Sequence, residues 1–201
     1  SGSQTWTEDN LTWTLSADGT TMTISGTGAM KEYYGSDNSP AYYNSKIKKV
    51  VIENGITSIG AYAFSGCTNL ASIEIPSSVT SVGDGAFQDC SSLTGITIPE
   101  SVTSIGDDAF YGTPWLTNKR QENDSLVIVN GILIDGTACS GKVTIPDGVT
   151  SIGNYAFMSC DGLTSITIPS SVTSIGVGVF DDCTALTEVL LEGGSTLTSE
   201  S

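Results

Sequence analysis

The apolar positions of the chain recur at a fixed interval of 23 residues. The block IPSSVTSVGDGAF at 75–87 returns as IPESVTSIGDDAF at 98–110, as IPDGVTSIGNYAF at 145–157 and as IPSSVTSIGVGVF at 168–180. A related block, IENGITSIGAYAF, occupies 52–64. Self-similarity at this period predicts a solenoid of short strands and turns, in which each repeat buries its apolar face only against its neighbours.

The first half of each repeat, Leu-x-x-Ile-x-Ile-Pro, predicts a strand. Ile73 and Ile75 are expected to face inward, and Ser72 and Glu74 outward, because successive side chains of a strand point to opposite faces. The proline that follows has no N–H to donate and ends the strand.

The second half of each repeat, Val-Thr-Ser-Ile-Gly, predicts a second short strand and a turn. Val79 and Val82 are expected to face inward, and the chain turns at Gly83. A short segment then returns the chain to the next strand, and we predict that Phe87 fills the interior of its coil.

Residues 1–46 carry no repeat and are predicted to form an N-terminal cap, which a solenoid needs to cover its first coil. Two alternating runs, LTWTL at 11–15 and TMTI at 21–24, flank Asp18-Gly19 and predict a β-hairpin. An aromatic cluster follows and is expected to pack in the cap, with sugar stacking as the alternative; it comprises Tyr33, Tyr34, Pro40, Tyr42 and Tyr43.

The repeats run from 47 to 192 and are interrupted by an irregular double repeat at 111–144. The run LVIVNGILI at 126–134 has Asn130-Gly131 between two apolar runs, which predicts a hairpin. The polar segment 113–125 before it is predicted to project as a loop. Residues 193–201 form a polar tail without an apolar cap.

Charge excludes several classes of partner. The chain has a net charge of −15, with seven basic residues and no histidine. A surface this acidic repels phosphate backbones and anionic lipid, which disfavours a nucleic-acid or membrane-surface role. No stretch is long and apolar enough to insert into a membrane.

Four of the five cysteines belong to the repeat: Cys67, Cys90, Cys160 and Cys183 each lie three residues after the repeat phenylalanine, whereas Cys139 does not. A coil spacing of roughly 4.8 Å would place Cys67 beside Cys90, a separation compatible with a disulfide. The frequent burial of free cysteine favours a ladder of buried thiols instead.

The sequence predicts neither catalysis nor a metal or cofactor site. Without histidine, Ser-His-Asp and Cys-His mechanisms and histidine metal sites are excluded. The pairs Asp107-Asp108 and Asp181-Asp182 are interpreted as solvated turn residues, because catalytic carboxylates need a shared cleft.

Two binding surfaces are candidates. The first is the outward sheet face opposite the buried isoleucines, where solenoids commonly bind partners, although small polar residues also suit a face that only stays soluble. It comprises Lys49, Val51, Ser72, Glu74, Gly95, Thr97, Lys142, Thr144, Ser165, Thr167, Glu188 and Leu190. The second is a loop with Trp115, Lys119 and Arg120, in which Trp115 either anchors a partner or packs onto the irregular coil.

The repeat IPxxVTSIGxxAFxxCxxLxxIxIP resembles that of the BspA-like leucine-rich repeat proteins of bacterial cell surfaces. The segment DNLTWTLSADGTTMTISGTGAM resembles their cap, and FYGTPWLTNKRQENDSLVIVNGILI resembles their irregular repeat. The resemblance covers about residues 9–192. It implies a right-handed leucine-rich solenoid, secreted or displayed on the surface of a host-associated bacterium, and it carries over no catalytic residues.

The sequence therefore predicts a non-enzymatic, extracellular protein-binding or adhesion module whose partner is a host or bacterial surface protein. A structural spacer that displays another domain and a glycan-binding module are the alternatives. The chain begins Ser1-Gly2 instead of with methionine, and we interpret it as a processed or recombinant fragment.

Overall fold

A computed structural model describes residues 2–193 of the chain. The protein is a mainly β solenoid that divides into two compact units, unit 1 (Ser1–Thr117) and unit 2 (Asn118–Ser201). The division falls inside the predicted irregular double repeat, and the short helix α1 (Pro114–Lys119) crosses it.

The cap at the start of unit 1 contains the predicted hairpin and one further strand. Strand β2 (Leu11–Leu15) pairs antiparallel with β3 (Thr21–Gly26), and β1 (Gln4–Glu8) adds to the far side of β2. Asp18 fixes the turn, because its carboxylate accepts hydrogen bonds from the side chains of Ser16 and Thr20, which also lower its pKa. Strand β1 was not predicted from the sequence.

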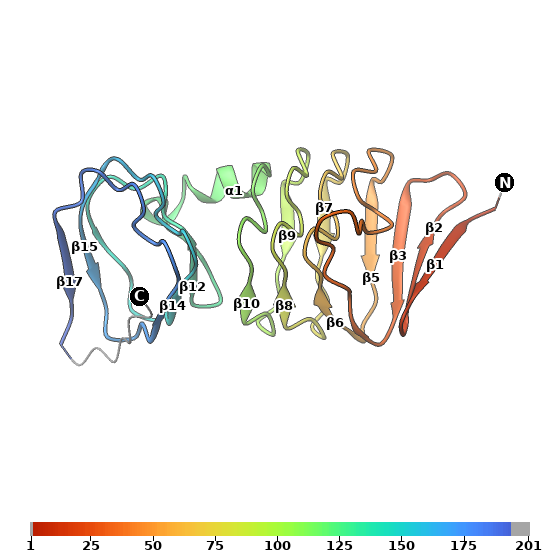
Figure 1. The fold of residues 1–201 in the computed structure, drawn as a ribbon, viewed down its shortest axis with the longest axis horizontal. Coiled ribbons are helices and arrows are strands. Elements are labelled where there is room, and N and C mark those ends of the chain that lie inside the picture. The colour runs from red at the N-terminus through yellow and green to blue at the C-terminus, as the bar shows by residue number, and fades with distance from the viewer. Residues whose placement is uncertain (1, 194–201) are drawn as a thin grey trace. The chain divides into compact units, whose positions relative to one another are not determined.

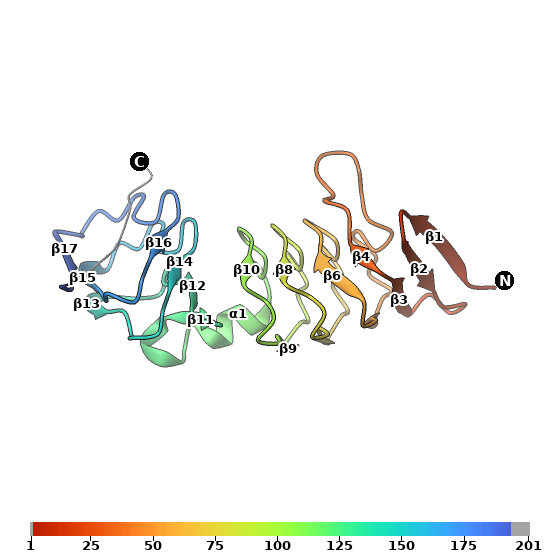
Figure 2. The same ribbon diagram turned by 90° about the horizontal axis from the view of Figure 1, so that it is seen from below.

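The cap continues directly into the repeats, because β3 pairs in parallel with β5 (Lys49–Ile52). The other strands of unit 1 stack coil on coil, as Figures 1 and 2 show. One parallel sheet has the order β10-β8-β6-β4, and β7 pairs with β9. Their bounds are β4 Gly28–Ala29, β6 Ile56–Ile59, β7 Ser72–Glu74, β8 Ser81–Val82, β9 Gly95–Thr97 and β10 Ser104–Ile105.

The inward positions of the repeat form the core, as predicted. Ile73, Ile75, Val79 and Val82 are all buried, and Phe87 has no exposed surface. Because no coil is thick enough to enclose these side chains alone, their burial depends on the coils to either side.

An aromatic column runs through the core of unit 1. Phe87 stacks between Phe64 and Phe110, with ring centroids 5.5 and 5.9 Å apart and planes within 14° of parallel. Trp13 lies 5.5 Å beyond Phe64, and Trp115 lies 4.7 Å beyond Phe110. A tryptophan therefore ends the column on each side.

The first strands of unit 2 follow a 3-10 turn, η1 (Asn123–Ser125), and form the predicted hairpin of β11 (Val127–Val129) and β12 (Ile132–Asp135). Asn130 and Gly131 both have positive φ, as a type I′ turn requires. Strand β12 then pairs in parallel with β14 of the next coil, and β14 pairs in parallel with β16. The sheets are β11-β12-β14-β16 and β13-β15-β17. The bounds of the repeat strands are β13 Gly141–Thr144, β14 Ser151–Ile152, β15 Leu163–Ile168, β16 Ser174–Ile175 and β17 Glu188–Leu191.

A glycine makes room for the first phenylalanine of unit 2. A Cβ on Gly136 would lie 2.2 Å from Cε1 of Phe157, so the ring of Phe157 occupies the space that a side chain there would need. Phe157 then stacks on Phe180, with ring centroids 5.7 Å apart.

The last described coil is open. Val189 and Leu191 of β17 are 46% and 54% exposed, whereas Ile166 and Ile168 at the same positions of the preceding coil are buried. Residues 194–201 of the predicted polar tail lie outside the described residues.

Cysteines form hydrogen bonds between coils. All five are free thiols, and only Cys183 is partly exposed. The Sγ–H of Cys90 donates to the Phe64 carbonyl of the preceding coil, and that of Cys183 donates to Phe157. A hydrogen bond with the neighbouring Cys67 thiol, together with burial, raises the pKa of Cys90.

Removal of one ring from the aromatic column is expected to destabilise unit 1 strongly. Phe87→Ala should lower the free energy of unfolding by about 3–5 kcal/mol, because it leaves a large cavity in the core. Guanidinium unfolding followed by tryptophan fluorescence reports unit 1, since Trp6, Trp13 and Trp115 all lie there. The control is Tyr111→Ala, which truncates an exposed aromatic of the same unit. A loss below about 1 kcal/mol for Phe87→Ala would contradict a core role.

Thiol accessibility provides a second check on the fold. Cys183 is the one cysteine with partly exposed surface, so one thiol per chain should react with a chromogenic disulfide reagent at pH 8. All five should react after unfolding in guanidinium. Three or more reactive thiols in the native protein would show that the cysteine ladder is not buried.

Candidate binding surface

Half of the sheet-face candidates lie on three neighbouring strands of unit 1, which Figure 1 shows side by side. They are Lys49 and Val51 on β5, Ser72 and Glu74 on β7, and Gly95 and Thr97 on β9. Val51 and Gly95 are half-buried and the other four are exposed. The alternation of outward and inward positions on β5 and β7 is therefore as predicted.

A hollow of about 470 Å³ lies on this face between β5 and β7. It is lined by four of the candidates, Lys49, Val51, Ser72 and Glu74, together with Pro76 and the strand backbones. It therefore presents an ammonium group and a carboxylate, separated by small and apolar side chains.

The hollow coincides with a break in the sheet, because no ladder joins β5 to β7 in the described chain. The N–H of Lys49 at the start of β5 donates to the carbonyl of Thr20, and the N–H of Glu53 just after β5 donates to the carbonyl of Ile24, so these residues bond toward β3. In a parallel ladder alternate residues bond to opposite neighbours. The main-chain groups of Val50 therefore face β7.

The far side of the hollow follows the same rule. The N–H of Gly95 donates to the carbonyl of Ala71, and the N–H of Ile75 donates to the carbonyl of Thr97. Ala71, Ile73 and Ile75 therefore bond toward β9. The main-chain groups of Ser72 and Glu74 consequently face β5. Since no strand pairs with them there, water or a bound partner must satisfy these donors and acceptors.

The other six candidates lie in unit 2, on the continuous sheet β13-β15-β17. Lys142, Thr144, Glu188 and Leu190 are exposed, whereas Ser165 and Thr167 on the central strand are half-buried. Lys142 and Thr144 also line a second hollow of about 410 Å³, together with Asp124, Ser140 and neighbouring residues.

The structure corrects the prediction of a projecting loop at 113–125. Residues Pro114–Lys119 form helix α1, and Trp115 is only 6% exposed because its ring packs on Phe110. Thr113 secures the start of this turn: its hydroxyl donates to the Phe110 carbonyl and accepts from the N–H of Leu116. Trp115 therefore takes the packing alternative and is not an exposed anchor.

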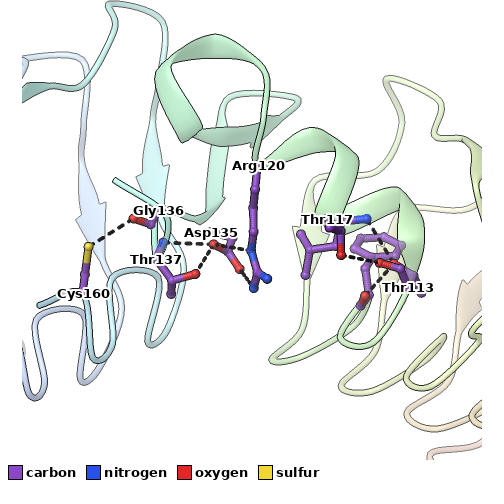
Figure 3. Close-up of polar contacts among 9 residues, drawn as sticks. Thr113, Thr117, Arg120, Asp135, Gly136, Thr137 and Cys160 are labelled. Atoms are coloured by element: carbon purple, nitrogen blue, oxygen red, sulfur yellow. Dashed lines mark hydrogen bonds and ion pairs between the residues drawn. The ribbon is translucent and has the colours of Figure 1, made fainter. Parts of the chain in front are cut away.

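The two basic residues of this segment already have partners in unit 2. The guanidinium of Arg120 donates to both carboxylate oxygens of Asp135, at 3.3 and 2.7 Å (Figure 3). Asp135 also accepts from the N–H and hydroxyl of Thr137. Lys119 pairs with Glu122 at 3.2 Å on the surface. Arg120 therefore fastens the segment after α1 to hairpin strand β12.

Three tyrosines of the aromatic cluster, which was expected to pack in the cap with sugar stacking as the alternative, are exposed. Tyr34, Tyr42 and Tyr43 are 52%, 40% and 54% exposed. In contrast, Tyr33 packs edge-on against Trp13 and donates to Glu8 as a cap residue should, and burial raises its pKa. The sequence identified the cluster but gave no signal to separate its buried member from its exposed ones.

The paired aspartates lie in turns, as predicted. Asp108 and Asp182 have φ of 53° and 55°, a left-handed turn conformation, and both are exposed. Within residues 2–193, no group of three or more His, Cys, Asp or Glu side chains converges to hold a metal ion. No helix in this range has the length and apolar character needed to cross a membrane.

Comparison with known proteins identifies the repeat. Residues 38–130 and 136–201 match the BspA-type leucine-rich repeat region in six copies. The chain belongs to this family. Among curated proteins, none matches the chain.

Several solved structures are similar. A leucine-rich repeat protein from Eubacterium ventriosum ATCC 27560 is 26% identical with a TM-score of 0.53, over 98% of this chain and 78% of that one. A leucine-rich cell surface protein from Faecalibacterium prausnitzii A2-165 is 23% identical over 97% and 81%, with a TM-score of 0.41. The pneumococcal vaccine antigen PcpA is 15% identical over 96% and 71%, with a TM-score of 0.43.

The ion pair of Arg120 is expected to stabilise unit 2. Arg120→Ala should cost about 1.5–3 kcal/mol, because Asp135 is largely buried and would lose a charged hydrogen-bond donor. Lys119→Ala is the control and should change stability by less than about 0.5 kcal/mol, since its pair is exposed. Thermal unfolding followed by circular dichroism measures both; equal effects of the two variants would contradict this role of Arg120.

Proposed function

We propose that this chain is an extracellular protein-binding module of a bacterial surface or secreted protein, without catalysis, and that it docks its partner on the β5–β7–β9 face of unit 1. Membership of the BspA-type leucine-rich repeat family supports a binding role, since stacked repeats present extended surfaces that solenoids use for recognition. It also supports the surface or secreted location that the sequence resemblance implies.

The observation that carries the proposal is the hollow between β5 and β7. Lys49 and Glu74 offer charges of opposite sign at its rim, and the open main-chain groups of Val50, Ser72 and Glu74 offer neutral donors and acceptors. A polypeptide carries the complementary groups along its own main chain, as in recognition modes that pair with exposed strand groups. The hollow therefore suits a protein partner better than a purely apolar ligand.

The surroundings of the hollow leave room for such a partner. Gly95 and Thr97 on the adjacent β9 strand carry little side-chain bulk, so they form a flat continuation of the face. A bound chain can thus lie across several coils without displacing a large side chain. Binding energy then comes from many modest contacts around a charged, partly desolvated centre.

A binding screen with a charge-swapped variant tests this proposal. The native chain is assayed against a panel of immobilised extracellular-matrix proteins and a glycan array. Lys49→Glu with Glu74→Lys preserves net charge but reverses both charges at the hollow, and should weaken binding at least about tenfold if the pair contacts the partner. The control, Lys46→Glu with Glu100→Lys, reverses two exposed charges that do not line the hollow.

The outcomes separate the alternative functions. A protein hit that the hollow variant loses and the control keeps supports the proposal. Equal binding by both variants would place the site elsewhere. Silence across both panels favours a structural spacer, and hits confined to the glycan array favour a sugar-binding module.

A further inference from the structure

Three exposed tyrosines lie on the segment between β4 and β5, and carboxylates lie near two of them. These side chains are here called the tyrosine–carboxylate surface: Tyr34, Tyr42, Tyr43, Glu32, Asp84 and Asp89. The segment that supplies the three tyrosines connects β4 to β5 and lies on the opposite side of unit 1 from β9 in Figure 2. The surface is therefore separate from the hollow between β5 and β7, and it does not depend on the function proposed for that hollow.

Hydrogen bonds between coils hold two of the rings in place. The hydroxyl of Tyr34 donates to Asp84 at 2.7 Å, and that of Tyr43 donates to Asp89 at 3.2 Å. Tyr34 also packs edge-on against Tyr62, with ring centroids 5.7 Å apart. The bond to Asp84 raises the pKa of Tyr34 to about 12, so its hydroxyl remains a donor at neutral pH. The hydroxyls of Tyr34 and Tyr43 are thus each hydrogen-bonded to a carboxylate.

Glycines of the following coils make room for the ring of Tyr43 and for that of Tyr62, on which Tyr34 packs. A Cβ on Gly66 would lie 2.4 Å from Cγ of Tyr43, and one on Gly85 would lie 2.3 Å from Cε1 of Tyr62. A side chain at either glycine would push the aromatic ring away from the coil. The rings therefore rest on bare backbone, and Tyr43 retains more than half of its surface for a partner.

The carboxylates of this surface have no cationic partner. Within residues 2–193, none of Glu32, Asp84 and Asp89 forms an ion pair. Glu32 and Asp84 each use one oxygen to accept a backbone N–H, from Ala61 and Asp107. Their negative charges are thus held in position without being neutralised, on a chain whose net charge is already −15.

We propose that the tyrosine–carboxylate surface binds an arginine- or lysine-rich segment of a partner protein. A guanidinium that lies on the open face of Tyr43 can donate to the free oxygen of Asp89, and a second cation can lie on the exposed face of the Tyr34 ring, near the carboxylates of Glu32 and Asp84. Aromatic faces attract cations, and a phenol that donates to a carboxylate has a more electron-rich ring. Arginine fits best, because its planar group stacks on the ring while its N–H groups reach the carboxylate.

Charge favours a cationic peptide over a neutral sugar. A sugar would use the ring faces but would leave three unpaired carboxylates uncompensated, whereas a basic segment neutralises them. The acidic chain also attracts basic segments over a distance, which raises the rate of encounter.

The test uses a fluorescently labelled hepta-arginine peptide, with hepta-lysine for comparison, titrated with the full chain at physiological salt and followed by fluorescence anisotropy. Asp84→Asn with Asp89→Asn keeps one acceptor oxygen at each position and removes two charges. It should weaken hepta-arginine binding at least about tenfold, as expected for loss of charge-assisted hydrogen bonds. The matched control, Asp181→Asn with Asp182→Asn, removes the same charge from exposed turn residues of unit 2 and should change binding less than about twofold if only screened long-range attraction is lost.

A second set of variants tests the rings. Tyr34→Leu with Tyr43→Leu removes both faces and should weaken binding about fivefold or more, whereas Tyr34→Phe with Tyr43→Phe keeps the faces and should stay within about threefold. Tyr111→Leu with Tyr155→Leu removes two other exposed tyrosines as a control. Tryptophan fluorescence confirms that each variant of unit 1 is folded.

Four results would overturn the proposal. Equal losses from the two aspartate pairs would show attraction by net charge alone. Unchanged binding by the leucine variant would show that the rings take no part. Failure of both peptides to bind the native chain, or displacement of bound peptide by a neutral oligosaccharide, would also refute it.

Discussion

Stacking of one coil on the next is the interaction on which this structure depends, and the aromatic column shows it most directly. Phe64, Phe87 and Phe110 each contribute one ring, and no ring is covered by residues of its own coil alone. The two ends of such a column would expose an aromatic face, and in unit 1 Trp13 and Trp115 cover them. The cap and helix α1, which share no sequence with the repeat, are thus joined to it through the same contact. A solenoid built in this way gains stability from each interface between neighbours, so its ends need special residues and its interior does not.

The repeat made the interior predictable. The inward isoleucines, valines and phenylalanines follow from strand alternation and the 23-residue period, and the Asn130-Gly131 hairpin follows from local turn chemistry. Where prediction failed, the deciding contact came from a residue distant in sequence or from the end of the stack. The sequence around Trp115 is polar, but Trp115 is buried because its ring packs on the ring of Phe110 at the end of the aromatic column. No local pattern signals that β5 and β7 lack a ladder, because both strands carry the normal alternation.

The difference between inward and outward positions of the repeat also explains where binding surfaces can form. Inward positions are constrained by the need to match the coils on either side, whereas outward positions of the sheet hold lysine, glutamate, serine, threonine and glycine in successive coils. The candidate residues of the sheet face could therefore be placed by register alone, without knowledge of a partner. The hollow they line could not, because it arises from the missing ladder between β5 and β7. The tyrosine–carboxylate surface was equally hidden, since Tyr34 meets Asp84 only after the chain has passed through two further coils.

These two surfaces of unit 1 differ in the physics of binding. The hollow offers both signs of charge and neutral main-chain groups, so a partner bound there would be selected by short-range contacts, through shape and hydrogen bonding. The tyrosine–carboxylate surface offers one sign of charge and fixed rings, so binding there would act at longer range and depend on salt. Because opposite charges at the hollow cancel at a distance while the net charge of −15 does not, a basic partner would be attracted by the acidic chain before it is oriented by any pocket. Under the two proposals, long-range attraction and short-range selection would fall on different faces of one unit, each of which can be altered without changing the inward residues that hold the coils together.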